Sequence, residues 1–323
     1  MNSAEPMFSV ITCCYNQGHF IEDCIRSVLD QHDGRIEHII IDSGFDETRA
    51  ICERYAHVQY HFQPPAGQSA ALNYGFELAR GEIIAWLNAD DYYLPGAFER
   101  VVAALRAAPA KTLIGGEAHV VNAGRGFMWK LKNGPVPFYR LLAHPLLYRL
   151  QGCTAMPCQP AVFFPQQMLT DIGLLRADLK YGMDYEFWLR ALEGGYRFRH
   201  IRQVFACYRY HDTSLTSSHG YDAFLPEWEA VSAAVRQHLP PARLHAANRW
   251  NLYFRLESII YRRHRRGIEI LNRLHCDKQQ SSLPAWAQAS RILQAFWIAP
   301  WLIAYTGLRT IRARLGAKRR LST

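Results

Sequence analysis

The sequence lacks the cysteine patterns of metal-binding and disulfide-rich proteins. Its 323 residues include eight cysteines, but no Cys-x-x-Cys pair and no spacing typical of zinc sites. Several cysteines lie within apolar runs, which favours buried thiols in a reducing cytosol over a disulfide framework. The N-terminal segment MNSAEPMFSV has no basic region followed by an apolar stretch, so we expect no secretion signal and a cytoplasmic protein.

Signatures of two other classes are also missing. No Gly-x-Gly-x-x-Gly motif follows the first apolar run, which disfavours a dinucleotide-dependent dehydrogenase. No RNA- or DNA-binding motif accompanies the basic residues, so we expect no nucleic-acid partner. The composition is that of an ordinary globular protein, with 49% hydrophobic and 20% charged residues. Local motifs must therefore carry the information about function.

Apolar runs and amphipathic stretches alternate along the chain. This alternation predicts an α/β fold with a mostly parallel, Rossmann-like sheet flanked by helices. The pattern turns wholly helical after about residue 220, which divides the chain into regions 1–220 and 221–323. The expected strands are 8–14, 37–42, 58–62, 81–87, 113–121, 161–164 and 198–208, and the expected helices are 20–31, 46–55, 68–79, 95–108 and 184–192.

Polar and acidic residues follow directly on three of the expected strands. These segments are Thr12–Asn16, Asp42–Asp46 and Asn88–Asp91. In an open α/β sheet, ligands collect outside the carboxyl ends of the strands. We therefore expect the three segments to converge on one crevice.

Five runs of the sequence carry recognisable motifs. They are SVITCCYNQGHFIEDCIRSVLDQ (9–31), IIIDSG (39–44), GQSAALNYGFELARGEIIAWLNADD (67–91), MDYEFWLR (183–190) and YRYHDTSLT (208–216). These motifs resemble those of the family 2 glycosyltransferases with the GT-A fold, and they follow the family's order over roughly residues 8–216. The resemblance implies an inverting enzyme that moves a sugar from a nucleotide-diphosphate sugar to an acceptor hydroxyl.

The run LNADD corresponds to the family's metal-binding Asp-x-Asp motif. The resemblance implies that Asp90 binds a divalent metal, Mn²⁺ or Mg²⁺, which neutralises the donor diphosphate. Asn88 replaces the first acid with a neutral oxygen donor, and Ala89 lies between them. His211 matches a family histidine and is implied as a second metal or diphosphate contact. Alternatively, the run is an acidic turn after a strand in which Asp90 or Asp91 caps the following helix.

The resemblance also implies a donor-binding surface. Asp42 would accept hydrogen bonds from the base or ribose, although an acid at a strand end can instead cap a turn. Gln68 and Asn73 belong to the signature GQSAALNYG, whose helix faces the donor in the family. The other implied substrate contacts are Thr12, Tyr15, Asn16, Asn88, Ala89 and Arg209.

Asp184 aligns with the family's catalytic base. Such a base removes a proton from the acceptor hydroxyl as its oxygen attacks the anomeric carbon, and a single displacement inverts that centre. Met183 replaces the glutamate that commonly precedes this acid. Asp184 could instead be the N-cap of its helix, with Glu186 as the reserve candidate for the base.

The C-terminal region is strongly basic. Residues 240–323 hold 16 Lys or Arg and 3 Asp or Glu, against 21 and 25 in residues 1–239. The apolar segment 292–308 is broken by Pro300 and is short for a spanning helix. With the basic runs at 262–266 and 309–320 beside it, this region predicts attachment to an anionic membrane surface, on the inner face of the cell membrane. The alternative is a helical cap packed on the catalytic domain.

The sequence leaves the donor and acceptor open. The resemblance allows UDP-, GDP- or dTDP-linked donors, and acceptors in cell-surface polysaccharide, lipopolysaccharide or glycolipid assembly, including lipid-linked glycans. The strongest alternative function is a non-catalytic nucleotide-sugar binding protein, because Asn88 and Met183 depart from the family pattern.

Overall fold

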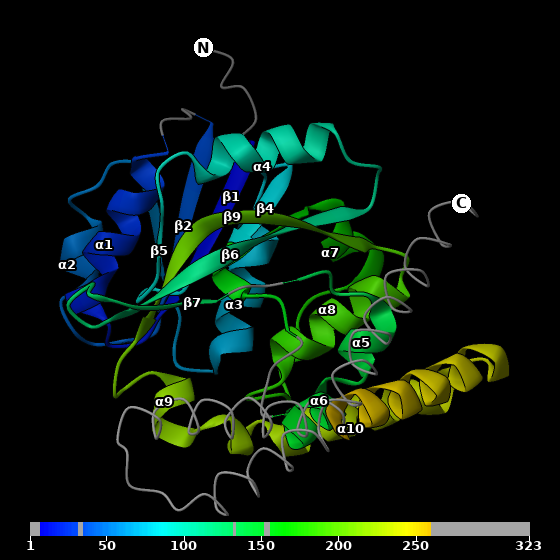
Figure 1. The fold of residues 1–323 in the computed structure, drawn as a ribbon. Helices are drawn as coiled ribbons and strands as arrows, with labels where there is room; N and C mark the ends of the chain where they lie inside the picture. Colours follow the sequence, from blue (N-terminus) through cyan, green and yellow to red (C-terminus); the bar gives the residue numbers. More distant parts are fainter. Residues whose placement is uncertain (1–6, 32–34, 132–133, 152–155, 260–323) are drawn as a thin grey trace, which may run out of the picture. The chain divides into compact units, whose positions relative to one another are not determined.

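The computed structural model describes residues 7–31, 35–131, 134–151 and 156–259, and a single sheet forms the centre of this part (Figure 1). Its strands are β1 (Phe8–Cys14), β2 (Ile36–Asp42), β3 (Val58–Phe62), β4 (Ile83–Trp86), β5 (Tyr92–Tyr93), β6 (Thr112–Asn122), β7 (Phe127–Leu131), β8 (Val162–Pro165) and β9 (Arg197–Tyr210). They follow the order β3-β2-β1-β4-β8-β6-β9-β5, with β7 paired to β6.

The first four strands form the parallel half of the sheet. β1 pairs in parallel with both β2 and β4, and β2 pairs in parallel with β3. The β1–β2 register runs from Phe8 opposite Ile36 to Cys14 opposite Asp42, so both strands end at the same level. The predicted α/β class is confirmed, and the carboxyl ends of these strands share one edge.

The second half of the sheet mixes strand directions. β8 lies between β4 and β6 and is antiparallel to both, whereas β6 and β9 are parallel. β5 and β7 are antiparallel additions to β9 and β6. The sequence did not predict β5 or β7. β5 is only two residues long, and β7 has an apolar run, Phe127–Trp129, whose side chains are exposed, so neither is a buried strand of ordinary length.

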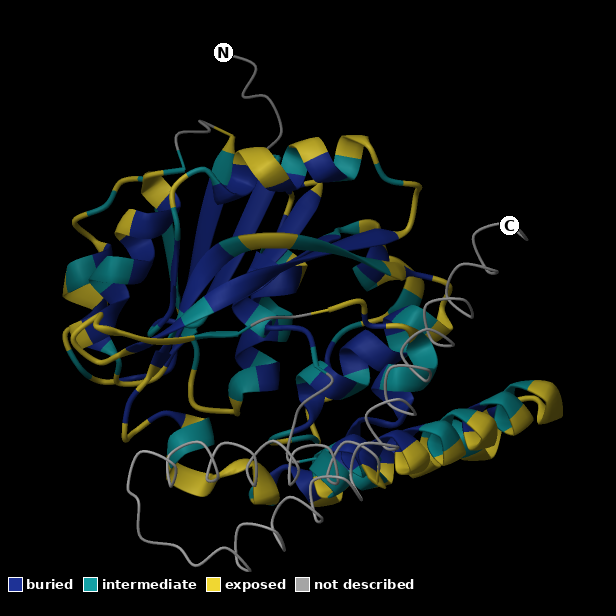
Figure 2. Ribbon diagram, in the orientation of Figure 1, coloured by how far each residue is buried: buried dark blue, intermediate teal, exposed yellow. Residues whose placement is uncertain are grey.

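Helices cover both faces of the sheet. Buried side chains of α1 and α4 pack with Phe8 and Val10 on one face, and α3 packs against β1 and β2 on the other. Figure 2 shows that the central strands β1, β2 and β4 are buried. A Cβ at Gly75 would lie 2.4 Å from Ile11 Cγ2, so α3 can approach β1 closely because residue 75 is glycine. The helices are α1 (Gly18–Leu29), α2 (Thr48–Cys52), α3 (Gln68–Leu78), α4 (Ala97–Arg106), α5 (Phe138–Leu142), α6 (His144–Gln151), α7 (Gln167–Ile172), α8 (Met183–Glu193), α9 (Leu215–His219) and α10 (Leu225–His238), with 3₁₀ turns η1 (Gln159–Ala161) and η2 (Tyr221–Ala223).

Helix α2 is shorter than expected. The sequence predicted helix over 46–55, but Asp46 lies before the helix and binds two backbone groups, with Oδ1 accepting from Thr48 N (3.1 Å) and Oδ2 from Gly18 N (2.7 Å). This carboxylate joins the β2–α2 turn to the start of α1.

The chain divides into two compact units. One contains residues 1–145 and 155–239 and includes the whole sheet, and the other contains 146–154 and 240–323. Residues 241–259 of the second unit are helical. The basic runs at 262–266 and 309–320 and the apolar segment 292–308 lie outside the described residues, and the functional boundary near residue 220 stays a prediction.

Candidate active site

Asp42 closes the turn at the end of β2. Its Oδ1 accepts a hydrogen bond from Gly44 N (2.8 Å), and its Oδ2 accepts one from the Tyr60 hydroxyl (3.0 Å). Burial raises the pKa of this carboxyl. A Cβ at Gly44 would lie 2.5 Å from Asn16 N, so the glycine lets the turns after β1 and β2 touch. The structure thus brings Asn16 and Asp42 to one place, as predicted.

The turn after β1 presents polar and aromatic groups. Asn16 adopts a left-handed conformation (φ 53°), and its Oδ1 accepts from Phe45 N (2.9 Å). Tyr15 is 58% exposed and Phe45 78% exposed, and the Phe45 ring lies 6.0 Å from that of Phe62. The sequence motifs did not point to Phe45 and Phe62. Their positions at or just after strand ends could have indicated that these rings lie near the site.

Asp90 and His211 meet across 121 residues of sequence. Their Oδ2 and Nε2 atoms are 3.0 Å apart, and both side chains are largely buried. The other ring nitrogen of His211 lies 2.9 Å from the Thr213 hydroxyl, which orients the imidazole. β5 pairs with β9, and Asp91 Oδ1 accepts from the backbone N–H of Arg209 (2.9 Å), so the two segments are joined. The predicted convergence of Asp90 and His211 is present.

Asn88 is held in a neutral hydrogen-bond network. Its Oδ1 accepts from Gln68 Nε2 (3.0 Å) and Trp86 Nε1 (2.9 Å), and its Nδ2 donates to Gln159 Oε1 (3.3 Å). Gln68 therefore reaches this part of the site, but through Asn88. The neighbouring Ala89 is fully buried, so its side chain offers no surface to a ligand.

Asp184 lies in the first turn of α8, after the N-cap residue Gly182. The alternative assignment of Asp184 as N-cap is therefore wrong. Burial of the carboxyl raises its pKa from 3.8 to about 6, although Oδ1 accepts a hydrogen bond from Tyr185 N (2.7 Å). The reserve candidate Glu186 forms two hydrogen bonds with Arg190, to Nε (2.8 Å) and Nη2 (2.8 Å). Asp184 is the better placed proton acceptor, because Arg190 already occupies Glu186.

The side chain of Arg209 points into the protein. It is 2% exposed, and its Nη2 donates to Asp23 Oδ2 (2.6 Å). The guanidinium also lies over the rings of Phe20 (4.5 Å) and Tyr92 (5.5 Å). The structure thus shows contacts of this guanidinium within the protein, and the substrate-binding role of Arg209 stays a prediction. The sequence showed a charge near His211, but it did not show that this side chain points into the protein.

Two more residues predicted to contact the substrate have hydrogen-bond partners within the protein. Asn73 uses both ends of its amide on Leu175, donating to the carbonyl (2.9 Å) and accepting from the N–H (2.9 Å). Thr12 is fully buried, and its Oγ1 shares a hydrogen bond with His38 Nε2 (2.9 Å). Both side chains bind polar groups within the protein, and their contacts with a donor stay predictions.

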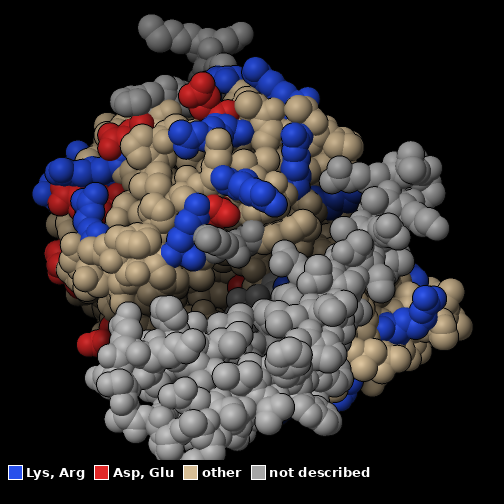
Figure 3. All heavy atoms as spheres, viewed as in Figure 1, with Lys and Arg blue, Asp and Glu red and all other residues tan. Residues whose placement is uncertain are grey.

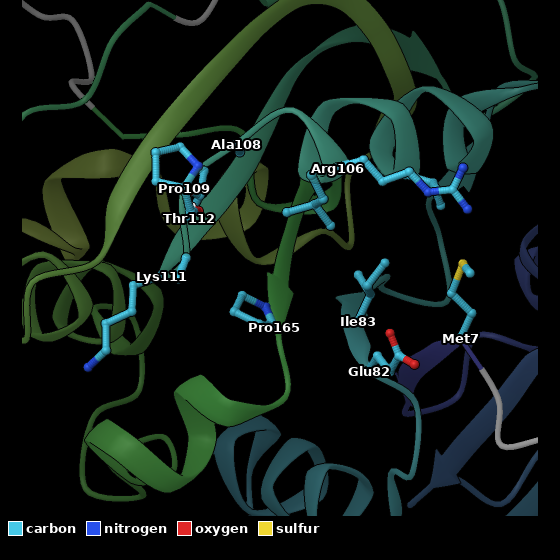
Figure 4. Close-up of a pocket in the computed structure, with 12 residues that line it drawn as sticks. Met7, Glu82, Ile83, Arg106, Ala108, Pro109, Lys111, Thr112 and Pro165 are labelled. Carbon is cyan, nitrogen blue, oxygen red and sulfur yellow. Dashed lines mark hydrogen bonds between the residues drawn. The ribbon is translucent and has the colours of Figure 1, made fainter.

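A separate hollow lies at the opposite edge of the sheet (Figure 4). It has a volume of about 300 Å³ and is lined by residues at the starts of β1, β4 and β6, among them Met7, Ile83 and Thr112. Asp42, at the end of β2, and Asp90, after β4, lie toward the carboxyl ends of the strands instead. This hollow is therefore distinct from the candidate site.

The family described as Glycosyl transferase family 2 matches residues 9–163. This range begins in β1, ends in β8, and includes Asp42, Asn88 and Asp90. The chain carries a glycosyl transferase family 2 domain. Asp184, His211 and Arg209 lie beyond the matched range.

Bacterial relatives agree with this assignment. An uncharacterized glycosyltransferase of Rickettsia typhi is 29% identical over 229 residues, which are 67% of this chain and 68% of the relative. The putative teichuronic acid biosynthesis glycosyltransferase TuaG of Bacillus subtilis is 36% identical over 107 residues, 31% of this chain and 42% of TuaG. The chain spans only 31% of the length of a Rickettsia felis relative, an uncharacterized glycosyltransferase that is 28% identical over 196 residues.

Solved structures share the fold at low identity. Residues 1–349 of Staphylococcus aureus TarS in complex with UDP-GlcNAc align with a TM-score of 0.58 at 20% identity, covering 76% of this chain and 72% of that one. The mannosyltransferase PcManGT of Pyrobaculum calidifontis, in complex with GDP-Man and Mn²⁺, aligns with a TM-score of 0.53 at 20% identity, covering 95% and 85%. These likenesses establish the GT-A-like architecture.

Proposed function

We propose that this protein transfers a sugar from a nucleoside-diphosphate sugar to an acceptor hydroxyl with inversion. The observation that carries the proposal is the meeting of Asp90 and His211 at the edge of the sheet where Asp42 also lies. TarS and PcManGT, which share the fold, were solved with UDP-GlcNAc and GDP-Man, and this supports a UDP- or GDP-linked donor over a dTDP-linked one.

The donor set at Asp90 and His211 fits a divalent metal. A carboxylate and an imidazole together suit Mn²⁺ slightly better than Mg²⁺. Among the described residues, no group of three or more His, Cys, Asp or Glu side chains is arranged to hold a metal ion. Such sites commonly use one or two protein ligands and complete the coordination with substrate phosphates. When bound, the ion would neutralise charge on the donor diphosphate.

Asp184 supplies the base in this mechanism. Its carboxylate takes the proton of the acceptor hydroxyl while the hydroxyl oxygen forms a bond to the anomeric carbon. The bond from that carbon to the diphosphate oxygen breaks, and the nucleoside diphosphate leaves with the electron pair. A carboxyl whose pKa is about 6 is mostly ionised at neutral pH and is a stronger base than an ordinary aspartate.

The turns after β1 and β2 would hold the nucleotide end of the donor. Tyr15 and Phe45 offer exposed rings beside Asp42 and Asn16, and a base can stack on such rings. In this arrangement Asp42, whose two oxygens already accept from Gly44 and Tyr60, uses its remaining lone pairs for the base or ribose.

We further propose that the acceptor belongs to cell-surface polysaccharide, lipopolysaccharide or glycolipid assembly and that the protein works at an anionic membrane surface. The name of the relative TuaG refers to teichuronic acid biosynthesis. In the helix over 241–259, Leu252, Leu256 and Ile259 are exposed at helical spacing, beside the exposed Arg249 and Arg255. A basic amphipathic helix of this kind binds headgroups from the surface. None of the described helices is both long and apolar enough to cross a bilayer.

The first unit, residues 1–145 and 155–239, also exposes basic groups. Figure 3 shows Lys and Arg side chains on the visible face of the first unit, and Arg197 and Arg202 of β9 are exposed. Such groups attract anionic surfaces within about a Debye length. Retention of the protein on phosphatidylglycerol vesicles at 0.15 M salt, but not on phosphatidylcholine vesicles, would support attachment to an anionic surface. Failure to bind either kind of vesicle, or equal binding to both, would reject it.

A second candidate is a binding protein without turnover. It is favoured by Asn88, which replaces the first acid of the Asp-x-Asp motif and is held in a neutral hydrogen-bond network. Of the two positions of that motif, only residue 90 offers a carboxylate, and this carboxylate contacts His211. A thermal-shift series of UDP-, GDP- and dTDP-sugars with and without Mn²⁺ identifies the ligand, since binding stabilises the native state. Release of nucleoside diphosphate on incubation with that donor would support the enzyme, and tight binding without release or transfer would support the binding protein.

A further inference from the structure

The segment that enters α8 is held by one carboxylate. Glu227, in the first turn of α10, accepts hydrogen bonds from three successive backbone N–H groups. Its Oε1 accepts from Lys180 N (3.1 Å), and its Oε2 accepts from Tyr181 N (2.8 Å) and Gly182 N (2.7 Å). These residues directly precede Met183, the first residue of α8.

Packing brings the two helices together at this point. A Cβ at Gly182 would lie 3.3 Å from Glu227 Cβ and 3.4 Å from Trp228 Cδ1, so residue 182 approaches α10 closely. Trp228 is buried, and the Tyr181 ring lies 4.9 Å from that of Phe224. The start of α10 therefore covers the segment 180–182.

The start of α8 needs such a partner. The first N–H groups of a helix have no acceptor within it, and they carry a partial positive charge that favours an anion. Gly182 is the N-cap and has no side chain that could accept a hydrogen bond. Glu227, 45 positions later in the chain, supplies an acceptor for one of these groups, the N–H of Gly182.

We infer that Glu227 is a positioning residue for Asp184. It fixes the backbone two residues before the base and thereby sets where the Asp184 carboxylate meets the acceptor hydroxyl. This inference rests on the proposed function. Glu227 lies outside the range that matches the family, 9–163, so neither that match nor the motifs in the sequence point to it.

The effect of losing Glu227 is local. The chain before this segment is anchored separately, because Asn73 holds Leu175 and Arg190 donates to the carbonyl oxygen of Leu174 (2.8 Å). Without the carboxylate, residues 180–182 lose three hydrogen bonds while the anchors at 174 and 175 remain. A displacement of the base by about 1 Å is enough to lower a rate about a hundredfold.

The test compares Glu227→Ala, Glu227→Gln and Glu227→Asp in the full chain. Glu99→Gln on α4 is the matched control, since Glu99 is exposed on another helix and its change removes the same charge. We expect Glu227→Ala to lower kcat for transfer by about tenfold to a hundredfold with little change in the KM for the donor. Glu227→Gln keeps one acceptor oxygen and should lose less, and Glu227→Asp should recover part of the rate.

Amide hydrogen exchange supplies a second readout. Exchange at 180–184 should accelerate in Glu227→Ala and stay unchanged in Glu99→Gln. Wild-type kcat and exchange in Glu227→Ala would overturn the inference while the proposed function stands, and so would a rate loss that Glu227→Asp does not recover at all. A wild-type protein that transfers no sugar from any donor would overturn the proposed function, and the inference would fall with it.

Discussion

Two regions of the site are built by different means. The edge that carries Asp42 and Asp90 is formed by residues at or just after parallel strands, so local sequence places them. The region around Asp184 instead depends on side chains that are distant in sequence, with Glu227, Asn73 and Arg190 holding residues 172–182. The proposed donor-binding end of the site is therefore specified by strand ends, whereas the proposed base is positioned by tertiary contacts.

The sharpest way to separate these regions is to remove the base alone. Asp184→Asn keeps the shape of the side chain but cannot accept the acceptor proton. We expect transfer to fall by about a thousandfold, because general base catalysis contributes about 10²–10⁴-fold. Donor binding, measured by thermal shift, should be unchanged. Transfer at the wild-type rate would show that Asp184 is not the base and would move the proposal to Glu186.

The next prediction concerns the residues proposed to bind the metal. Asp90→Ala should abolish the stabilisation that Mn²⁺ adds to donor binding and lower transfer by about a hundredfold, because the charge of the diphosphate is no longer balanced. His211→Ala should show the same loss in weaker form. Asp212→Asn, an exposed acid next to His211, is the control and should behave as wild type. Persistent Mn²⁺ dependence in Asp90→Ala would separate Asp90 from the metal.

Sequence predicted the first region better than the second. Every strand of the parallel half was predicted, and so was the meeting of Asp90 with His211. The insertion of β8 between β4 and β6 was not, since strand order depends on how whole elements pack. Arg209 was assigned to the substrate because its sequence position gives no direction, and the structure turns it toward Asp23. Glu227 was missed because three N–H groups 45 to 47 residues away carry no sequence signal.

The pH dependence of the transfer rate tests the region around Asp184 separately. The pKa of Asp184 is raised to about 6 by burial, and the base must be ionised to act. We therefore expect kcat to fall about tenfold for each pH step of one below 6, and to level off above about 7. Donor affinity should not follow this curve. A rate that stays constant from pH 7 to pH 4.5 would contradict the assignment.

The smallest effect concerns stability at the same residue. The folded state holds the Asp184 proton up to a pH of about 6, whereas the ordinary value is 3.8, so the folded state binds more protons between these values. Stability therefore declines as pH rises through this window, and the loss persists above it.

The variant Asp184→Asn tests this effect, because it removes the ionisable group. The variant should be more stable than wild type at pH 7.5, by about 1 kcal/mol after discounting for the partly exposed side chain, with no such gain at pH 3.5. Urea unfolding at both pH values measures this difference. A gain of the same size at both would indicate that the amide stabilises α8 by some other contact, and that the buried charge costs the fold nothing.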